Sequence, residues 1–164
     1  AYRLVGYENR LLNDEDFNDD TKDAGEIGSG QTVTALYEII PVGVKSPYLK
    51  SIDKLKYQKV ISTSTETAEV ATIKVRYKQP GENTSIPFSI PVFDEGTAFK
   101  EASENLRFAS SVAMFGMLLR DSEYTKDNSF EEVIELADNA RTYDYEGYKA
   151  EFFRLVKSVS SIKH

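Results

Sequence analysis

The first half of the chain follows the two-residue period of β-strands. Its clearest stretch is 70–78, in which apolar and polar residues alternate, a pattern typical of a strand with one apolar face. A second stretch, 85–92, also has an apolar residue at every other position. Between them, Pro80 and Gly81 favour a tight turn, because proline restricts φ and glycine tolerates a positive φ. The two stretches therefore predict a β-hairpin.

Two further segments, 2–10 and 32–40, are rich in Tyr, Val, Thr and Ile, and we expect both to be strands. Pro87 and Pro91 lie in the second strand of the hairpin and cannot donate ladder hydrogen bonds. Proline at such positions predicts an edge strand. We therefore expect residues 1–95 to be mainly β, as an antiparallel sheet or partial β-sandwich.

The second half changes to helical spacing, with apolar residues three and four positions apart. This spacing predicts about three packed helices over 98–164, the first of them at 104–120. Side chains suited to capping precede each helix: Ser103, Ser129 with Glu132 completing a capping box, and Asp144. Gly116 lowers helix propensity inside the first helix, so we expect close packing there.

The last predicted helix carries an apolar stripe at three- and four-residue spacing. Its members are Tyr145, Tyr148, Phe152, Leu155, Val159 and Ile162. Such a stripe is compatible with a coiled-coil seam or a partner-binding face. Packing against neighbouring helices is the more common use of an amphipathic helix, and we favour it here.

Length and composition are those of a globular protein. The chain has 164 residues, 40% of them hydrophobic and 29% charged. We therefore expect a single α+β domain over 1–164, with 1–95 mainly β and 98–164 mainly α. The chain starts AYRLVGYENR, without an initiator methionine and already with the composition of a strand, so we expect it to be the C-terminal part of a longer protein. No apolar run approaches the ~18 residues of a membrane helix, which predicts no direct membrane insertion.

Missing residue types exclude several kinds of chemistry. The chain has no cysteine, and its single histidine is the last residue, His164. Thiol catalysis and thiolate metal sites are therefore excluded, and a histidine-based triad or zinc site is disfavoured. A net charge of −7 argues against nucleic acid as a partner. We expect no enzymatic activity and no bound organic cofactor.

Negative charge is concentrated in residues 13–26, NDEDFNDDTKDAGE. This segment, here called the acidic segment, has seven carboxylates and one lysine, so it carries −6 of the net −7. Alternate carboxylate and amide side chains are typical of calcium loops, although this segment departs from the EF-hand at its sixth and twelfth positions. The candidate ligands are Asp14, Asp16, Asn18, Asp20 and Asp23. The alternative is a series of turns closed by Asp and Asn side chains, with lysines from 42–59 partly neutralising the charge.

Several longer motifs resemble a known family. They are YRLVGYENRLLNDEDFNDDTKDAGEIGSGQTVTALYEIIP, TIKVRYKQPG, LRFASSVAMFGMLLRDS and EGYKAEFFRLV. Together they cover nearly the whole chain apart from about 42–69. They resemble the uncharacterised C-terminal domain that follows the von Willebrand factor type A domain in a group of bacterial surface proteins, many of them lipoproteins.

The resemblance implies a context rather than a catalytic site. It implies a preceding von Willebrand factor A domain in the same polypeptide, an unknown protein partner, and a cell-envelope location with anchoring through upstream regions. The implied role is that of a non-enzymatic structural or protein-interaction domain. Calcium binding by the acidic segment is the alternative function.

Overall fold

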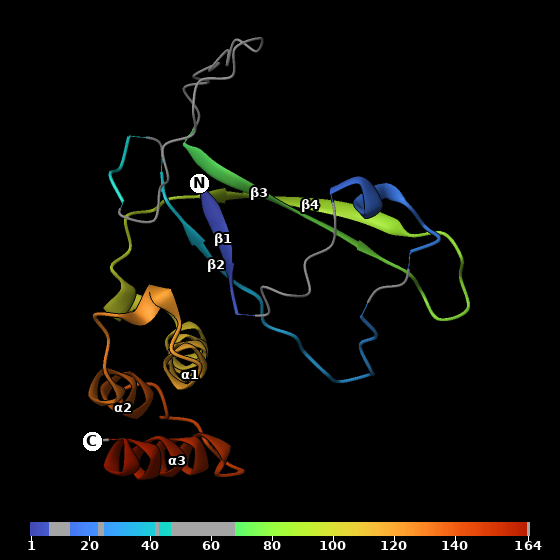
Figure 1. The fold of residues 1–164 in the computed structure, drawn as a ribbon. Coiled ribbons are helices and arrows are strands. Elements are labelled where there is room, and N and C mark those ends of the chain that lie inside the picture. Colours follow the sequence, from blue (N-terminus) through green and yellow to red (C-terminus); the bar gives the residue numbers. More distant parts are fainter. Residues whose placement is uncertain (7–13, 23–24, 42, 47–67, 164) are drawn as a thin grey trace. The chain divides into compact units, whose positions relative to one another are not determined.

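The computed structural model describes residues 1–6, 14–22, 25–41, 43–46 and 68–163 (Figure 1). Contacts group the chain into two compact units. The first, here called the β unit, comprises Ala1–Arg3, Leu11–Ser29 and Glu38–Gly96, and the second, the helical unit, comprises Leu4–Arg10, Gly30–Tyr37 and Thr97–His164. The predicted α+β class is confirmed, while the behaviour of 1–164 as one domain stays a prediction.

The described strands form two small antiparallel sheets, β1–β2 and β3–β4. Their bounds, with that of one short 3₁₀ helix, are β1 Tyr2–Val5, η1 Asp14–Asn18, β2 Leu36–Ile39, β3 Glu69–Tyr77 and β4 Ile86–Phe93. At one end of the first sheet Ala1 and Ile40 exchange backbone hydrogen bonds, both 2.8 Å long. All four predicted strand segments therefore contain a strand.

The strand predicted at 32–40 is shorter than expected. Gly6 has a φ of +79°, which lies outside the strand region, so β1 ends at Val5. Residues 7–10, the rest of the segment predicted as a strand at 2–10, lie outside the described residues. Residues 31–35 form no strand, so β2 begins at Leu36.

The β3–β4 hairpin closes as predicted. The Glu82 N–H donates to the Gln79 carbonyl at 3.0 Å, and Gly81 between them has a φ of +83°. Proline followed by a residue with positive φ defines a type II turn. The local turn chemistry therefore places β4 back against β3.

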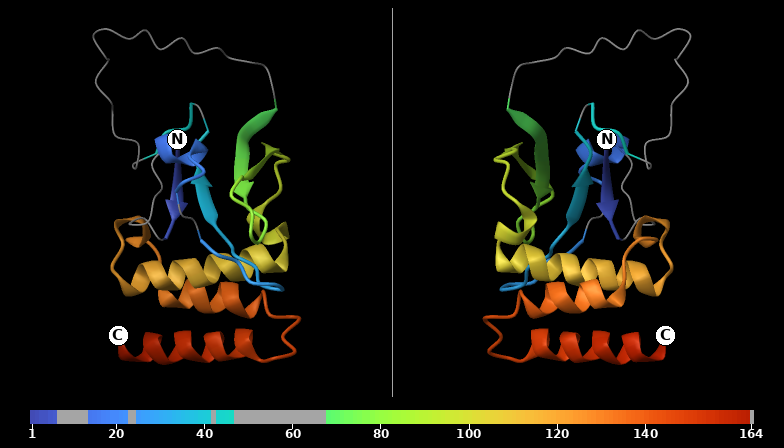
Figure 2. Two further views of the ribbon diagram at one scale, coloured as in Figure 1. Left: turned by 90° about the vertical axis from the view of Figure 1, so that its right-hand side faces the viewer. Right: turned by 90° about the vertical axis from the view of Figure 1, so that its left-hand side faces the viewer.

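The helical unit contains α1 Glu104–Leu119, α2 Phe130–Asp138 and α3 Tyr148–Ile162, with short 3₁₀ turns at Phe99–Glu101 and Glu123–Thr125. The three helices lie side by side (Figure 2). Their centre is the buried set Phe115, Val133 and Val156, one residue from each helix. The Phe115 ring meets Phe130 and Phe152 edge-to-face, at centroid distances of 6.0 and 5.5 Å. Such contacts add to the stabilisation from burial alone.

The predicted starts of α1 and α2 are confirmed, whereas α3 begins at Tyr148, after the N-cap Gly147, and not at Tyr145 as expected. The Ser103 hydroxyl accepts from the Leu106 N–H at 3.2 Å, and Ser129 with Glu132 forms a complete capping box. The Asp144 carboxylate accepts from two backbone N–H groups of α3, at 3.0 and 2.8 Å. Each cap satisfies donors that a helix end would leave unpaired. No helix in the described part of the chain has the length and apolar character needed to cross a membrane.

The predicted stripe on α3 is only partly the buried one. Phe152 and Val159 pack on the core as expected, but the fully buried residue of the helix is Val156. Leu155 is 51% exposed and Ile162 is 80% exposed. A helix advances about 100° per residue, so the four-residue step from Phe152 to Val156 follows the buried face and the three-residue step to Leu155 leaves it.

Lys149 at the start of α3 ties the three helices together. Its ammonium donates to Glu104 of α1 at 2.7 Å and to the Ala140 carbonyl at 3.1 Å, and it lies 5.3 Å from the centroid of the Phe108 ring. The hydrogen bond from Lys149 is the main reason why the pKa of Glu104 falls from 4.5 to about 2. The charged form of the Glu104 carboxylate therefore stabilises the helical unit.

Gly116 does not have the close packing that we expected. A methyl group added at its Cα would meet no atom within 4 Å, and its φ is not in the positive range. We expect Gly116→Ala to raise the free energy of unfolding by about 1 kcal/mol, because alanine has the higher helix propensity. The neighbouring Phe115→Ala should instead lower it by about 3–5 kcal/mol. Urea unfolding followed by far-UV circular dichroism measures both, and a destabilised Gly116→Ala would contradict the open space seen here.

The Glu104–Lys149 pair predicts a pH-dependent stability. Because the folded pKa of Glu104 is depressed, its contribution is complete above about pH 4.5 and is lost as the pH falls towards 2. We expect Glu104→Gln to be less stable than the wild type at pH 7 and the gap to close between pH 4.5 and 2. Glu146→Gln, at an exposed position, is the control. Thermal unfolding of the wild type and the variant at several pH values measures this difference in stability. A difference that does not vary with pH would refute the stabilising role of the Glu104 carboxylate.

Candidate interaction surface

One face of the β3–β4 hairpin is entirely apolar. Side chains of a strand alternate between two faces, and directly paired residues of neighbouring strands share a face. The register pairs Ile73 with Ile90 and Val75 with Phe88. The surface so formed, here called the apolar hairpin face, consists of Ala71, Ile73, Val75 and Tyr77 of β3 and Ile86, Phe88, Ile90 and Val92 of β4.

Much of the apolar hairpin face is accessible to solvent. Ile73 and Ile90 are 50% and 51% exposed, and Phe88 is 44% exposed. Tyr77 and Phe88 meet edge-to-face with their ring centroids 6.2 Å apart, so the face is ordered by its own contacts. Contiguous exposed apolar surface of this kind typically marks an interaction site.

Burial differs sharply between the two units. Every buried apolar residue in the described part of the chain belongs to the helical unit: Phe115, Met117, Val133, Ala137, Ala140 and Val156. In the described part of the β unit, the apolar residues lie on surfaces that are only half covered. A two-stranded sheet of this kind needs further strands or a helix against its apolar face for independent stability.

The opposite face of the hairpin is held by the acidic segment. Arg76, on the polar face of β3, donates to the Phe17 carbonyl at 2.9 Å and to the Asp20 carboxylate at 2.7 Å. It also donates to the Asn18 side chain at 3.3 Å and to the Ser85 hydroxyl at 2.7 Å. The guanidinium thus connects two parts of the chain far apart in sequence with several charge-assisted hydrogen bonds.

The Asp20 carboxylate is surrounded by donors. It accepts from the Ser85 hydroxyl as well as from Arg76, and the Lys78 ammonium donates to its backbone carbonyl at 2.6 Å. The bond from Ser85 is the largest cause lowering the pKa of Asp20, and the charges of Arg76 and Lys78 act in the same direction. The pKa of Asp19 is also lowered, chiefly by hydrogen bonds from Thr21.

The predicted calcium ligands have other partners where the structure describes them. Asp20 and Asn18 share Arg76, and Asp16 forms an ion pair with Lys22 at 3.2 Å. The side chain of Asp14 and the whole of Asp23 lie outside the described residues. Among the side chains that are described, no group of three or more carboxylates or histidines has the geometry of a metal site.

The sequence patterns did not identify Arg76 as the residue that connects the acidic segment to β3. The lysines expected to neutralise the acidic segment lie mostly in 47–59, outside the described residues. A signal was present, because Arg76 is a cation on the polar face of the clearest strand. Its partners lie 56 to 59 residues away in sequence, so only the tertiary fold identifies them.

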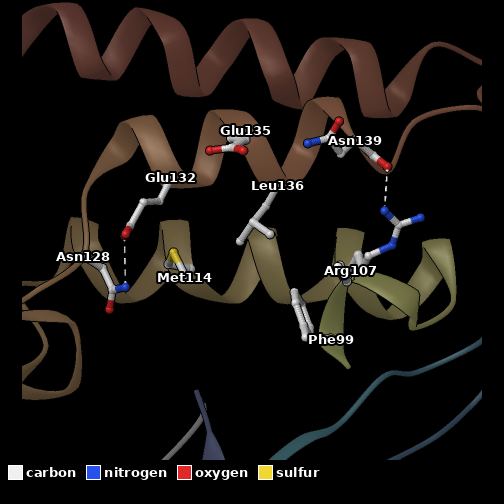
Figure 3. A pocket seen from close by; sticks show the side chains of 9 residues that line it. Phe99, Arg107, Met114, Asn128, Glu132, Glu135, Leu136 and Asn139 are labelled. Carbon is white, nitrogen blue, oxygen red and sulfur yellow. Dashed lines mark hydrogen bonds between the residues drawn. The ribbon is translucent and has the colours of Figure 1, made fainter. Parts of the chain in front are cut away.

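A groove of about 590 Å³ lies between α1 and α2 in the helical unit (Figure 3). Near one end the Arg107 guanidinium donates to the Asn139 carbonyl at 3.0 Å, and at the other the Asn128 amide donates to Glu132 at 3.0 Å. Glu132 also completes the cap of α2. These polar groups are therefore occupied in holding the helices, and the apolar hairpin face remains the stronger candidate for a functional surface.

Comparison with known proteins places the chain in a family. The family model described as "Uncharacterized protein YfbK, C-terminal" matches residues 1–162. The chain is also 38% identical over 163 residues to a protein of Escherichia coli (strain K12) described as "Uncharacterized protein YfbK". That match covers 98% of this chain and 27% of the relative, so the chain spans about a quarter of the relative's length. No solved structure matches the chain. The chain therefore belongs to the family of YfbK C-terminal domains.

Proposed function

We propose that this chain is a non-enzymatic structural and protein-interaction domain whose apolar hairpin face packs against another part of the same polypeptide. The observation that carries the proposal is the contrast in burial, since the helical unit has a core and the described β unit exposes its apolar face. The match to about a quarter of a longer relative supports a neighbour within the same chain.

The resemblance in the motifs beginning at Tyr2 favours a preceding von Willebrand factor A domain as part of that neighbour. In this proposal the A domain contacts a further protein partner, and the present domain supports it. The setting is the bacterial cell envelope, with a lipid anchor in upstream regions. Nucleic acid is not a proposed partner, because the net charge is −7. No catalytic role is proposed, since the chain has no cysteine and only the terminal His164.

Calcium binding by the acidic segment is the alternative prediction. Side-chain cations already meet its carboxylates, Arg76 at Asp20 and Lys22 at Asp16. A calcium ion would have to displace these cations, which makes tight binding at these carboxylates unfavourable. We therefore rank the calcium module below the interaction domain.

Thermal unfolding in EDTA and in millimolar calcium separates these two functions. An ion at a hundredfold its dissociation constant stabilises a protein by about 2.7 kcal/mol, which corresponds to roughly 5–10 °C in midpoint for a chain of this size. We expect calcium to change the unfolding midpoint by less than about 1 °C. Magnesium at the same concentration is the control, and we expect it to have an equally small effect. A rise in the larger range, specific to calcium, would favour the calcium module instead.

Binding measurements test the interaction domain directly. We define the N-terminal fragment as the polypeptide that precedes residue 1 in the natural full-length protein. Ile90→Thr should weaken binding of residues 1–164 to this fragment by about tenfold in calorimetry, because it removes apolar surface from the contact. Leu155→Gln is the matched control, since Leu155 and Ile90 are both 51% exposed but lie in different units. Equal effects of the two variants, or no binding by the wild type, would refute the proposal.

A further inference from the structure

The two edges of the β3–β4 hairpin are chemically different. The register pairs Pro87 with Arg76 and Pro91 with Thr72. Proline has no N–H, so the ladder between the strands uses the alternate pairs, such as Ile73 with Ile90. The nitrogens of Pro87 and Pro91 therefore point away from β3, towards the outer edge of β4.

The outer edge of β4 is poorly suited to receive another strand. Three consecutive outward positions along it are Pro87, Ser89 and Pro91, and only Ser89 has an N–H to donate. An added strand would find one donor where a regular ladder offers three. Proline on an edge strand is a recognised way of preventing further pairing.

The outer edge of β3 has the opposite character. Its outward positions are Thr72, Lys74 and Arg76, the partners of Pro91, Ser89 and Pro87, and all three have an N–H and a carbonyl. In the part of the chain that the structure describes, β3 pairs only with β4. The hairpin therefore presents one complete edge and one blocked edge.

We infer that an extended segment from the N-terminal fragment adds to the outer edge of β3 and makes the hairpin a three-stranded sheet. The inference rests on the proposed function, and it specifies how the contact is made. Main-chain hydrogen bonds to Thr72, Lys74 and Arg76 would fix the segment, as in other cases of strand addition. A third strand also supplies what an isolated hairpin lacks for stability.

The chemistry of the added strand follows from the alternation of faces. Side chains at every other position would extend the apolar hairpin face beside Ile73 and Val75, so these positions should be apolar. The intervening positions would lie on the face that carries Lys74, which favours polar or acidic residues there. Because β4 is blocked, the added strand reaches the apolar face only from the side of β3.

A pair of proline variants tests which edge is used. Lys74→Pro removes an outward N–H from β3, and Ser89→Pro removes the one remaining outward N–H among three positions of β4. Both lie at edge positions where proline spares the ladder between the two strands. We expect Lys74→Pro to weaken binding of residues 1–164 to the N-terminal fragment at least tenfold in calorimetry. Ser89→Pro should change it less than twofold, and thermal unfolding of each variant checks its folding.

The outcomes distinguish the inferred strand addition from the proposed packing of the apolar hairpin face. If Ile90→Thr weakens binding while Lys74→Pro behaves as Ser89→Pro does, the strand addition is wrong and the proposed function stands. If none of these variants weakens binding, both are wrong.

Amide exchange of the wild-type protein tests the same point without a variant that has to fold. Adding the N-terminal fragment should slow exchange of the Lys74 amide at least tenfold and leave the Ser89 amide unchanged. An unchanged Lys74 amide in the bound state would overturn the inference.

Discussion

The hydrogen bonds of Arg76 determine which face of the β3–β4 hairpin is left for packing. The guanidinium binds the Phe17 carbonyl and the Asp20 carboxylate, and so fixes the acidic segment to the polar face of the strand. The apolar side chains of the same strand must then face the other way, because strand side chains alternate. The Lys78 ammonium and the Ser85 hydroxyl, at the turn end of the hairpin, add further hydrogen bonds to Asp20 of the same segment.

The same contact changes the meaning of the acidic segment. Its alternating carboxylates are typical of an ion-binding loop when seen as a local pattern. In the fold, the positive charge near Asp20 comes from Arg76 and Lys78, and the Ser85 hydroxyl adds a further donor. A side-chain cation is covalently part of the protein and loses less entropy than a free ion when it binds. The described part of the segment is therefore best understood as a structural contact, and calcium binding stays the alternative prediction.

Local patterns predicted the elements well, and their contacts poorly. The hairpin, its turn at Gly81 and the caps at Ser103, Ser129 and Asp144 all follow from residues within a few positions of one another. The start of β2 at Leu36, four residues later than expected, did not follow from composition, since the residues before it also favour a strand. Val156 and not Leu155 is the buried residue of α3. Which of the two is buried depends on how α3 is rotated against the neighbouring helices, and apolar spacing alone does not determine that rotation. The partners of Arg76, more than 50 residues away, were beyond any local pattern.

The contrast between the two units gives the apolar hairpin face its significance. Folding has to offset the conformational entropy of each ordered residue, and buried apolar surface is the main source of that stabilisation. The helical unit has such a source in Phe115, Val133 and Val156. The described β unit has a well-formed hairpin, a polar face held by Arg76 and an apolar face that is half exposed. For an ordered sheet with its described apolar side half exposed and one complete edge on β3, the partner that we propose would contribute both apolar surface and backbone hydrogen bonds.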